Sequence, residues 1–192
     1  MRDYLATIFR VLVPLWPEAR PLLHYRSPFE LLCSVIMSAQ TTDDQVNKVT
    51  PALFARYPDA RAMAAADVAE VEDLIRSIGF FRTKARHLVM TAAIIDQRYG
   101  GQVPNTMEAM LELPGVGRKT ANLVLSSCFG LPGIIVDTHV LRVAERLGIS
   151  KVRDPGLVER IIADNLESER HTAFSHALNR HGKFTCVARK PA

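Results

Sequence analysis

Helix start and stop signals recur along the whole chain and constrain its fold more than any other feature. Ser, Thr or Asp stands before most of the apolar patterns of helical period, and glycine or proline often follows them. The turn at 114–117 contains two glycines, and we expect the second of them, Gly117, to begin the next helix. The other expected helices span 28–39, 43–57, 67–78, 83–99, 138–147, 154–166 and 172–181. This pattern predicts an all-α protein.

The run Gly133-Ile134-Ile135-Val136 is the strongest counter-signal, because β-branched residues bounded by turn residues favour a strand. No other segment offers a partner strand, and a single strand cannot form a sheet. We therefore expect 133–136 to be a buried connector that leads into a helix beginning after Asp137.

The composition fits a soluble globular protein, since 48% of the 192 residues are hydrophobic and 23% are charged. The net charge is only +4, but basic residues are clustered. The clusters are Arg82-Lys84-Arg86, Arg118-Lys119 and the basic residues of 180–190. Such clusters suit a polyanion, although an ordinary solvated surface has similar ones. Charge alone favours neither interpretation.

The N-terminus has no signal-peptide pattern, and no apolar run reaches the roughly 20 residues that span a bilayer. We therefore expect a cytoplasmic protein. Cys33, Cys128 and Cys186 lie far apart, which favours neither a disulfide framework nor a zinc site. Cys33 and Cys128 fall in apolar helical patterns, so we expect buried thiols there.

The segment 111–121, LELPGVGRKTA, joins two helical patterns through a Pro-Gly-Val-Gly turn. Its glycines allow backbone conformations and close approaches that a Cβ would prevent, and Val116 between them can anchor the turn in the core. Backbone N–H groups at the start of the second helix can bind a DNA phosphate, and the carbonyls of Leu113 and Val116 can bind a monovalent cation. Alone, such a turn favours an ordinary helical hairpin.

The longer context changes that interpretation. LPGVGRKTANLVL (113–125) is followed by VDTHV (136–140), and this pairing resembles the helix-hairpin-helix and Gly-Pro-Asp glycosylase superfamily. The chain most resembles the endonuclease III family, whose segments are similar to 38–43, 78–85 and 181–191 in the same order. The resemblance implies two helical domains with a DNA-binding cleft between them: 22–132, and 1–21 with 133–192.

The resemblance also implies a catalytic pair, Lys119 and Asp137. Lys119 lies in the first turn of its helix, where the helix dipole disfavours the ammonium and so favours a nucleophilic amine. In the family this lysine attacks C1′, expels the damaged base and forms a Schiff base, after which β-elimination cuts the strand. Asp137 would cap a helix and also stabilise positive charge on the sugar.

Other DNA contacts are implied with less support from the residues themselves. Gln40 would fill the gap left by the extruded nucleotide, and residues 78–81 would form a wedge, although a loop glutamine and buried aromatic residues are the alternatives. His139 and Arg142 belong to the motif region, and His139 is expected to be a structural group rather than a catalyst. The remaining expected DNA-binding residues are Thr41, Arg82, Lys84, Gly115, Gly117 and Arg118.

The family usually has four cysteines near the C-terminus that hold a [4Fe–4S] cluster. Only Cys186 is present here, and the next ligand would fall one residue beyond Ala192. We expect no cluster completed by this chain. Either the natural chain is longer, which the position of its end favours, or this is a cluster-free form.

The expected activity is base-excision repair: an N-glycosylase for oxidised pyrimidines in duplex DNA, with abasic-site lyase cleavage, acting as a monomer associated with the nucleoid. One alternative is a monofunctional glycosylase for adenine or mismatched thymine, whose relatives generally lack a lysine at the position of Lys119. A second is a catalytically silent DNA-binding protein, which the joint presence of Lys119 and Asp137 disfavours. An unrelated helical interaction protein is the third.

Overall fold

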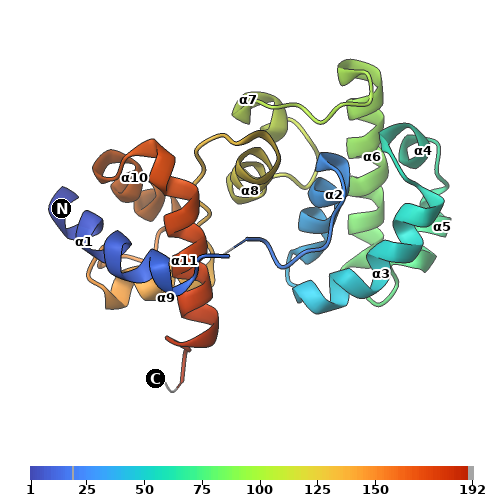
Figure 1. The fold of residues 1–192 in the computed structure, drawn as a ribbon. Coiled ribbons are helices and arrows are strands. Elements are labelled where there is room, and N and C mark those ends of the chain that lie inside the picture. Colours follow the sequence, from blue (N-terminus) through green and yellow to red (C-terminus); the bar gives the residue numbers. More distant parts are fainter. Residues whose placement is uncertain (19, 190–192) are drawn as a thin grey trace. The chain divides into compact units, whose positions relative to one another are not determined.

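The computed structural model describes residues 1–18 and 20–189. All regular secondary structure in those residues is helical, so the all-α prediction is confirmed. The helices are α1 (Arg2–Leu12), α2 (Pro28–Ser38), α3 (Asp43–Arg56), α4 (Ala60–Ala64), α5 (Val68–Leu74), α6 (Phe81–Tyr99), α7 (Met107–Leu111), α8 (Arg118–Phe129), α9 (Thr138–Arg146), α10 (Pro155–Asn165) and α11 (His171–Phe184), with short 3₁₀ helices η1 (Val13–Leu15) and η2 (Ser168–Arg170) (Figure 1). Within the described residues, none of these helices is both long enough and apolar enough to cross a membrane.

The backbone contacts divide the chain into two compact units. The central unit is Leu22–Val124, and the terminal unit is Met1–Pro21 with Leu125–Ala192. The domain boundaries expected from the family, 22–132 against 1–21 with 133–192, stay a prediction.

Helix α6 organises the central unit, where it contacts α2, α4 and α5. Its buried face includes Leu88, Ala92 and Ile95, all fully inaccessible to solvent. These residues are spaced at helical period and form one apolar stripe along α6, against which several shorter helices can pack. The inner face of α2 is also apolar, and it holds Cys33 at 0 % exposure.

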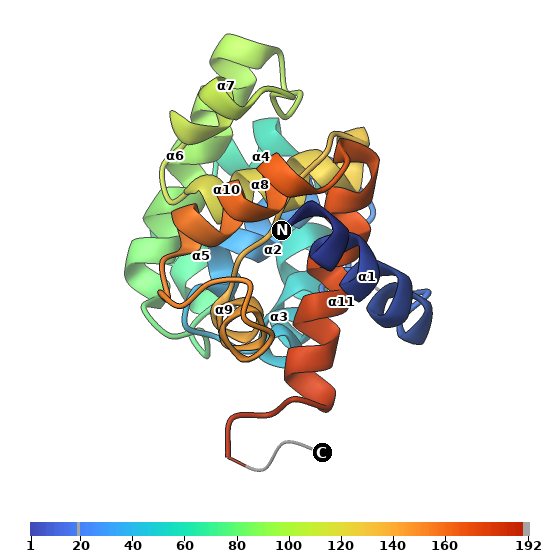
Figure 2. The same ribbon diagram turned by 90° about the vertical axis from the view of Figure 1, so that its left-hand side faces the viewer.

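In the terminal unit α11 packs against α1 and α9, as the two views of the ribbon show (Figures 1 and 2). Phe174 is a fully buried member of its apolar core. Ile134 and Val136 of the run 133–136 also enter this core, at 4 % and 6 % exposure, without forming a strand. The run is therefore a buried connector, as predicted.

Short-range capping explains most of the helix starts. Ser27, Thr42, Asp137 and Asp154 accept hydrogen bonds from backbone N–H groups at the starts of α2, α3, α9 and α10. The start of α6 differs from the prediction: it begins at Phe81 rather than Thr83, because Phe80 enters the helix in the left-handed region without a capping side chain.

Several other expectations need correction. Helix α5 ends at Leu74 rather than Ile78, and α11 continues to Phe184 rather than His181. The short helices α4 and α7, and also α1, were not expected from the sequence. Cys33 is buried as predicted, and burial raises the pKa of its thiol. Cys128 is only partly buried, because it lies in the last turn of α8.

Helices α9 and α11 approach so closely that Gly182 has no room for a side chain. An added Cβ would lie 3.0 Å from the Cβ and carbonyl oxygen of His139 and 3.0 Å from Val143 Cγ2. Because two of these three atoms are backbone or directly attached to it, the helices themselves would have to move apart. The spacing of α9 and α11 thus depends on a glycine at position 182.

Gly182→Ala should lower the free energy of unfolding by about 1–3 kcal/mol, the usual cost of overpacking a core. For a chain of this length, the thermal midpoint should fall by about 2–4 °C per kcal/mol. Circular dichroism melts measure it. Gly156→Ala is the control, because Gly156 is exposed and an added Cβ there meets only Asp154 Oδ1 at 3.4 Å. Equal midpoints for the two variants would contradict the packing argument.

Candidate nucleic-acid interface and active site

The turn between α7 and α8 is held rigidly by the rest of the central unit. Gly115 adopts φ 76°, which favours glycine, and an added Cβ would lie 2.8 Å from His87 Nδ1. Val116 is 8 % exposed, so the prediction that it anchors the turn is confirmed. Thr91 Oγ1 of α6 donates to the Pro114 carbonyl at 2.9 Å. Sequence reasoning missed both contacts from α6.

The carbonyl of Leu113, one of the two expected cation ligands, accepts a hydrogen bond from Val116 N at 3.1 Å. That bond closes the turn and occupies one lone pair of the oxygen. The cation site itself stays a prediction.

Packing and backbone conformation require a glycine at position 115, but they do not require one at position 117. A Cβ added at Gly117 would meet no heavy atom within 4 Å, and its φ is not in the left-handed region. The fold of this chain therefore does not need a glycine there. An external group can approach the backbone at the start of α8 closely because no side chain stands in its path.

Lys119 is the second residue of α8, and its side chain is exposed. Arg118 before it is exposed as well. The exposed start of α8 therefore presents two basic side chains and helix-terminal N–H groups together, an arrangement that attracts anions.

Asp137 is held by three hydrogen bonds. Its Oδ1 accepts from the backbone N–H groups of His139 and Val140 at 2.9 and 2.8 Å, so the predicted cap is confirmed. Its Oδ2 accepts from Asn179 Nδ2 of α11 at 2.7 Å. Asn179 lies 42 residues away in sequence, so no local pattern predicts this contact. The three donors fix the orientation of the carboxylate.

Lys84 does not lie at the surface, which corrects its expected role as a DNA contact. It is 5 % exposed, and burial lowers the pKa of its ammonium. Nζ donates to the carbonyls of Met37 and Ala39 at 2.7 and 2.6 Å and to Thr41 Oγ1 at 3.0 Å. These carbonyls belong to the end of α2, where backbone acceptors lack helical partners. Lys84 is a C-terminal cap for α2.

Gln40 and Phe80 are the two residues other than glycine with left-handed backbones among those described, at φ 55° and 59°. That conformation costs such residues about 1–2 kcal/mol. Both side chains are exposed, Phe80 by 67 %. The two loops are neighbours, since a Cβ at Gly79 would lie 3.7 Å from the Gln40 carbonyl. Phe80 is thus not a buried helix-ending aromatic, one of the two interpretations of this segment.

Arg82 is exposed, as expected of a surface contact. Its guanidinium lies over the Phe81 ring, 5.3 Å from the centroid, and its Nε is 4.0 Å from a Glu72 carboxylate oxygen. The long ion pair leaves the orientation of Arg82 weakly constrained.

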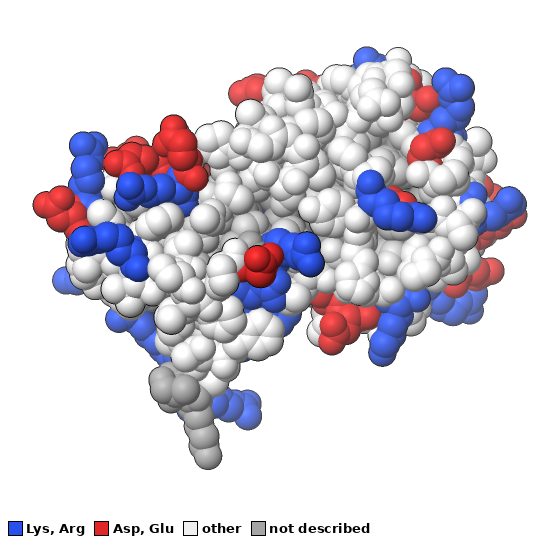
Figure 3. Space-filling view, in the orientation of Figure 1, with Lys and Arg blue, Asp and Glu red and all other residues white. Residues whose placement is uncertain are grey.

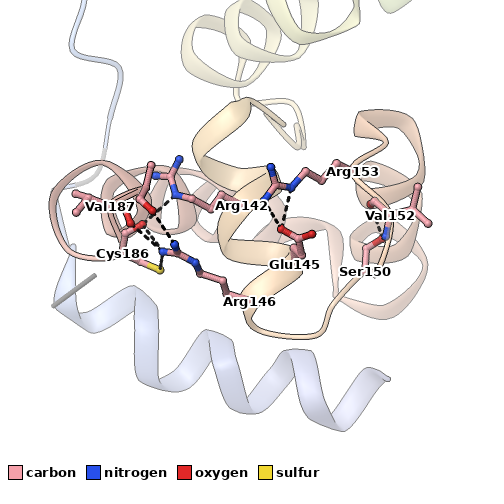
Figure 4. A network of polar contacts seen from close by, with 9 residues as sticks. Arg142, Glu145, Arg146, Ser150, Val152, Arg153, Cys186 and Val187 are labelled. Carbon is pink, nitrogen blue, oxygen red and sulfur yellow. Dashed lines mark hydrogen bonds and ion pairs between the residues drawn. The ribbon is translucent and has the colours of Figure 1, made fainter. Parts of the chain in front are cut away.

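The chain end around Cys186 is held by arginines of α9 (Figure 4). Arg146 Nη1 lies 3.0 Å from Cys186 Sγ and donates to the Val187 carbonyl at 2.9 Å. Arg142 donates to the carbonyls of Cys186 and Gly182 at 3.1 and 2.6 Å, and its Nη2 lies 3.1 Å from His139 Nδ1. His139 is therefore in a structural contact, as expected, and Arg142 also makes structural contacts.

The described residues do not fit a [4Fe–4S] cluster. Within 1–18 and 20–189, no group of three or more His, Cys, Asp or Glu side chains could hold a metal ion. The Cys186 thiol contacts the Arg146 guanidinium, and Cys33 and Cys128 lie elsewhere, in α2 and α8. Residues 190 and 191 of the expected family segment lie outside the described residues.

Surface charge does not identify the DNA-binding face by itself. On the side drawn in Figure 3, basic and acidic side chains are interspersed over both units. The helix-terminal geometry of α8 is more informative than that mixture of charges.

Comparisons with known proteins support the interpretation of the turn. A sequence profile described as "HhH-GPD superfamily base excision DNA repair protein" matches residues 33–168. The endonuclease III of Synechocystis sp. is 48% identical over 185 residues, which cover 96% of this chain and 84% of that protein. The endonuclease III of Escherichia coli K12 is 40% identical, covering 91% of this chain and 83% of the relative.

Solved structures show the same fold. A trapped endonuclease III–DNA covalent intermediate superposes with a TM-score of 0.94 at 40% identity, covering all of this chain and 90% of that one. A thermostable thymine-DNA glycosylase shares the fold alone, with a TM-score of 0.83 at 24% identity, covering 98% of this chain and 90% of the other. The chain therefore belongs to the endonuclease III family of the HhH-GPD superfamily of base excision DNA repair proteins.

Proposed function

We propose that this DNA glycosylase and abasic-site lyase removes oxidised pyrimidines from duplex DNA through Lys119. The observation that carries the proposal is an exposed lysine in the first turn of α8, directly after the rigid turn, in a chain of the endonuclease III family. Relatives with a trapped covalent intermediate on DNA support a covalent route. The enzyme acts as a monomer, in the cytoplasm where the nucleoid lies.

In the proposed reaction the neutral Lys119 amine attacks C1′ of the damaged nucleotide. The bond between C1′ and the base breaks, and the base leaves with the electron pair and a proton. The attacking nitrogen supplies that proton. Its second proton passes to O4′ as the C1′–O4′ bond of the sugar ring breaks with its electron pair on O4′, which gives a C1′=N Schiff base. Removal of a C2′ proton then expels the 3′ phosphate by β-elimination, and water hydrolyses the Schiff base to free Lys119.

Asp137 supplies the negative charge in this proposal. A carboxylate stabilises the positive charge that develops on the sugar as the base leaves, and it assists proton transfer near the lysine. The hydrogen bonds from His139 N, Val140 N and Asn179 keep the carboxylate from turning away, so little reorganisation is needed during the reaction. Lys119 lies in the central unit and Asp137 in the terminal unit.

The start of α8 binds a backbone phosphate in this proposal. Gly115 shapes the turn, Gly117 leaves its backbone approachable, and Arg118 adds positive charge. Such a contact positions the duplex without reading its sequence.

Gln40 and Phe80 act on the duplex from which the nucleotide is extruded. Extrusion costs a few kcal/mol, and less for damaged or mispaired bases, which contributes to selectivity. An exposed amide at Gln40 can replace the lost pairing partner, and an exposed Phe80 ring can wedge against the stack. Thr41 beside Gln40 and Arg82 beside Phe81 complete the proposed contacts.

Lys119→Gln should abolish covalent trapping by borohydride and strand cleavage, because an amide cannot form a Schiff base. Duplex binding and the thermal midpoint should change little, since the side chain is exposed. The assay uses one duplex with an oxidised thymine and one with an abasic site. The control is Lys151→Gln, which also removes an exposed lysine.

Trapping retained in Lys119→Gln would show that another amine is the nucleophile. Base release by the wild type without any trapping would favour a monofunctional glycosylase. Binding without base release or cleavage would favour the catalytically silent alternative.

Asp137→Asn should lower the single-turnover rate of base release by about 10²-fold, the scale of one lost electrostatic contact in a transition state. Asparagine is also a good cap, so the thermal midpoint should change little. Asp154→Asn is the control, since Asp154 also caps a helix, accepting from Leu157 N at the start of α10, and has no proposed role in the chemistry. Equal rates for Asp137→Asn and the wild type would reduce Asp137 to a helix cap.

A further inference from the structure

One face of α6 contacts both loops that we assign to DNA binding. Lys84 reaches residues 39–41, and Thr91 donates to the Pro114 carbonyl in the α7–α8 turn. His87 lies against Gly115 of the same turn, because an added Cβ there would be 2.8 Å from its ring. Positions 84, 87 and 91 are three and four residues apart, so they share one side of the helix.

The contacts of Lys84 bracket Gln40. Its ammonium binds the carbonyl of the preceding residue, Ala39, and the hydroxyl of the following residue, Thr41. The Thr41 N–H also donates to the Ser38 carbonyl at 3.0 Å, which closes the turn. Gln40 between these anchors has the unfavourable φ of 55° and an exposed side chain. A backbone in a sparsely populated conformation persists only where its surroundings impose it, and Lys84 is the buried group that does so.

The proposed reaction gives Lys84 no other task. At 5 % exposure with three oxygen partners, its ammonium is not available to a phosphate. Its neighbours in the basic cluster, Arg82 and Arg86, are exposed. The buried member of the cluster therefore differs in function from the exposed ones.

We propose that Lys84 is a positioning residue for nucleotide extrusion, whose buried ammonium presents Gln40 at a fixed place relative to the phosphate-binding turn. This inference rests on the proposed gap-filling function of Gln40. Lys84 acts through the conformation of 39–41, so its removal raises the cost of ordering that loop on DNA. Chemistry at Lys119 on a sugar that needs no extrusion is unaffected.

The experiment is a double-mutant cycle of Lys84→Met and Gln40→Ala. Extrusion is followed by stopped-flow fluorescence of 2-aminopurine placed opposite an oxidised thymine in duplex DNA. Borohydride trapping on single-stranded DNA with an abasic site measures the chemistry without extrusion. Lys48→Met is the control, because Lys48 is an exposed lysine of the same unit, on α3.

We expect Lys84→Met to slow extrusion about tenfold, equivalent to about 1.4 kcal/mol, with trapping on single strands unchanged. Gln40→Ala should slow extrusion as well. The double variant should be no slower than the slower single variant, because the two residues act as one unit. If Lys84→Met does not fold, Lys84→Gln replaces it, since its amide keeps an N–H donor for the carbonyls.

Four outcomes would overturn the inference. Additive effects in the double variant would mean that Lys84 does not act through Gln40. An equal loss of trapping on single strands would mean that Lys84 only stabilises the fold. Unchanged extrusion in Lys84→Met, beside slow extrusion in Gln40→Ala, would refute the positioning role of Lys84 and leave the gap-filling function of Gln40 standing. Unchanged extrusion in Gln40→Ala would refute the gap-filling function on which the inference rests.

Discussion

The backbone groups left unpaired at helix ends are the constraint around which this chain is built. The last carbonyls of α2 need a donor, and Lys84 supplies it from inside the central unit. The first N–H groups of α9 need an acceptor, and Asp137 supplies it. In both places a charged side chain pairs with backbone groups that lack helical partners. At the same time, Lys84 fixes the loop 39–41, and the cap fixes the orientation of the Asp137 carboxylate. The start of α8, after Gly117, is the helix end that we assign instead to an external anion.

The helix starts marked by Ser27, Thr42, Asp137 and Asp154 were predictable from the sequence, because a cap acts on N–H groups two or three residues away. The all-α fold and the buried connector at 133–136 were predictable for a similar reason: the absence of any partner strand can be read from the chain alone. The family resemblance identified the turn and its two glycines, although it could not distinguish the packing need at Gly115 from the open space at Gly117.

Contacts between distant segments were not predictable. Asn179 reaches Asp137, and Arg146 reaches the Cys186 segment, across about 40 residues of sequence. Their pairing depends on how α11 packs against α9, which no local pattern specifies. Lys84 was placed with the surface charges because it stands between Arg82 and Arg86. A signal was available, since Lys84 precedes the buried Leu88 by four residues and so lies on the apolar face of its helix.

Gly182 carries a consequence for how this sequence can diverge. Apolar residues such as Val143 and Phe174 can be exchanged in evolution for others of similar volume, because a core tolerates coordinated repacking. Position 182 has no such freedom, since the backbone and Cβ of His139 already occupy the space. Asn179 precedes Gly182 by less than one turn of α11. The close contact of α9 and α11 at Gly182 therefore also sets the distance between Asn179 and Asp137. Selection on the placement of that carboxylate therefore acts on a residue that has no side chain and takes no part in the chemistry.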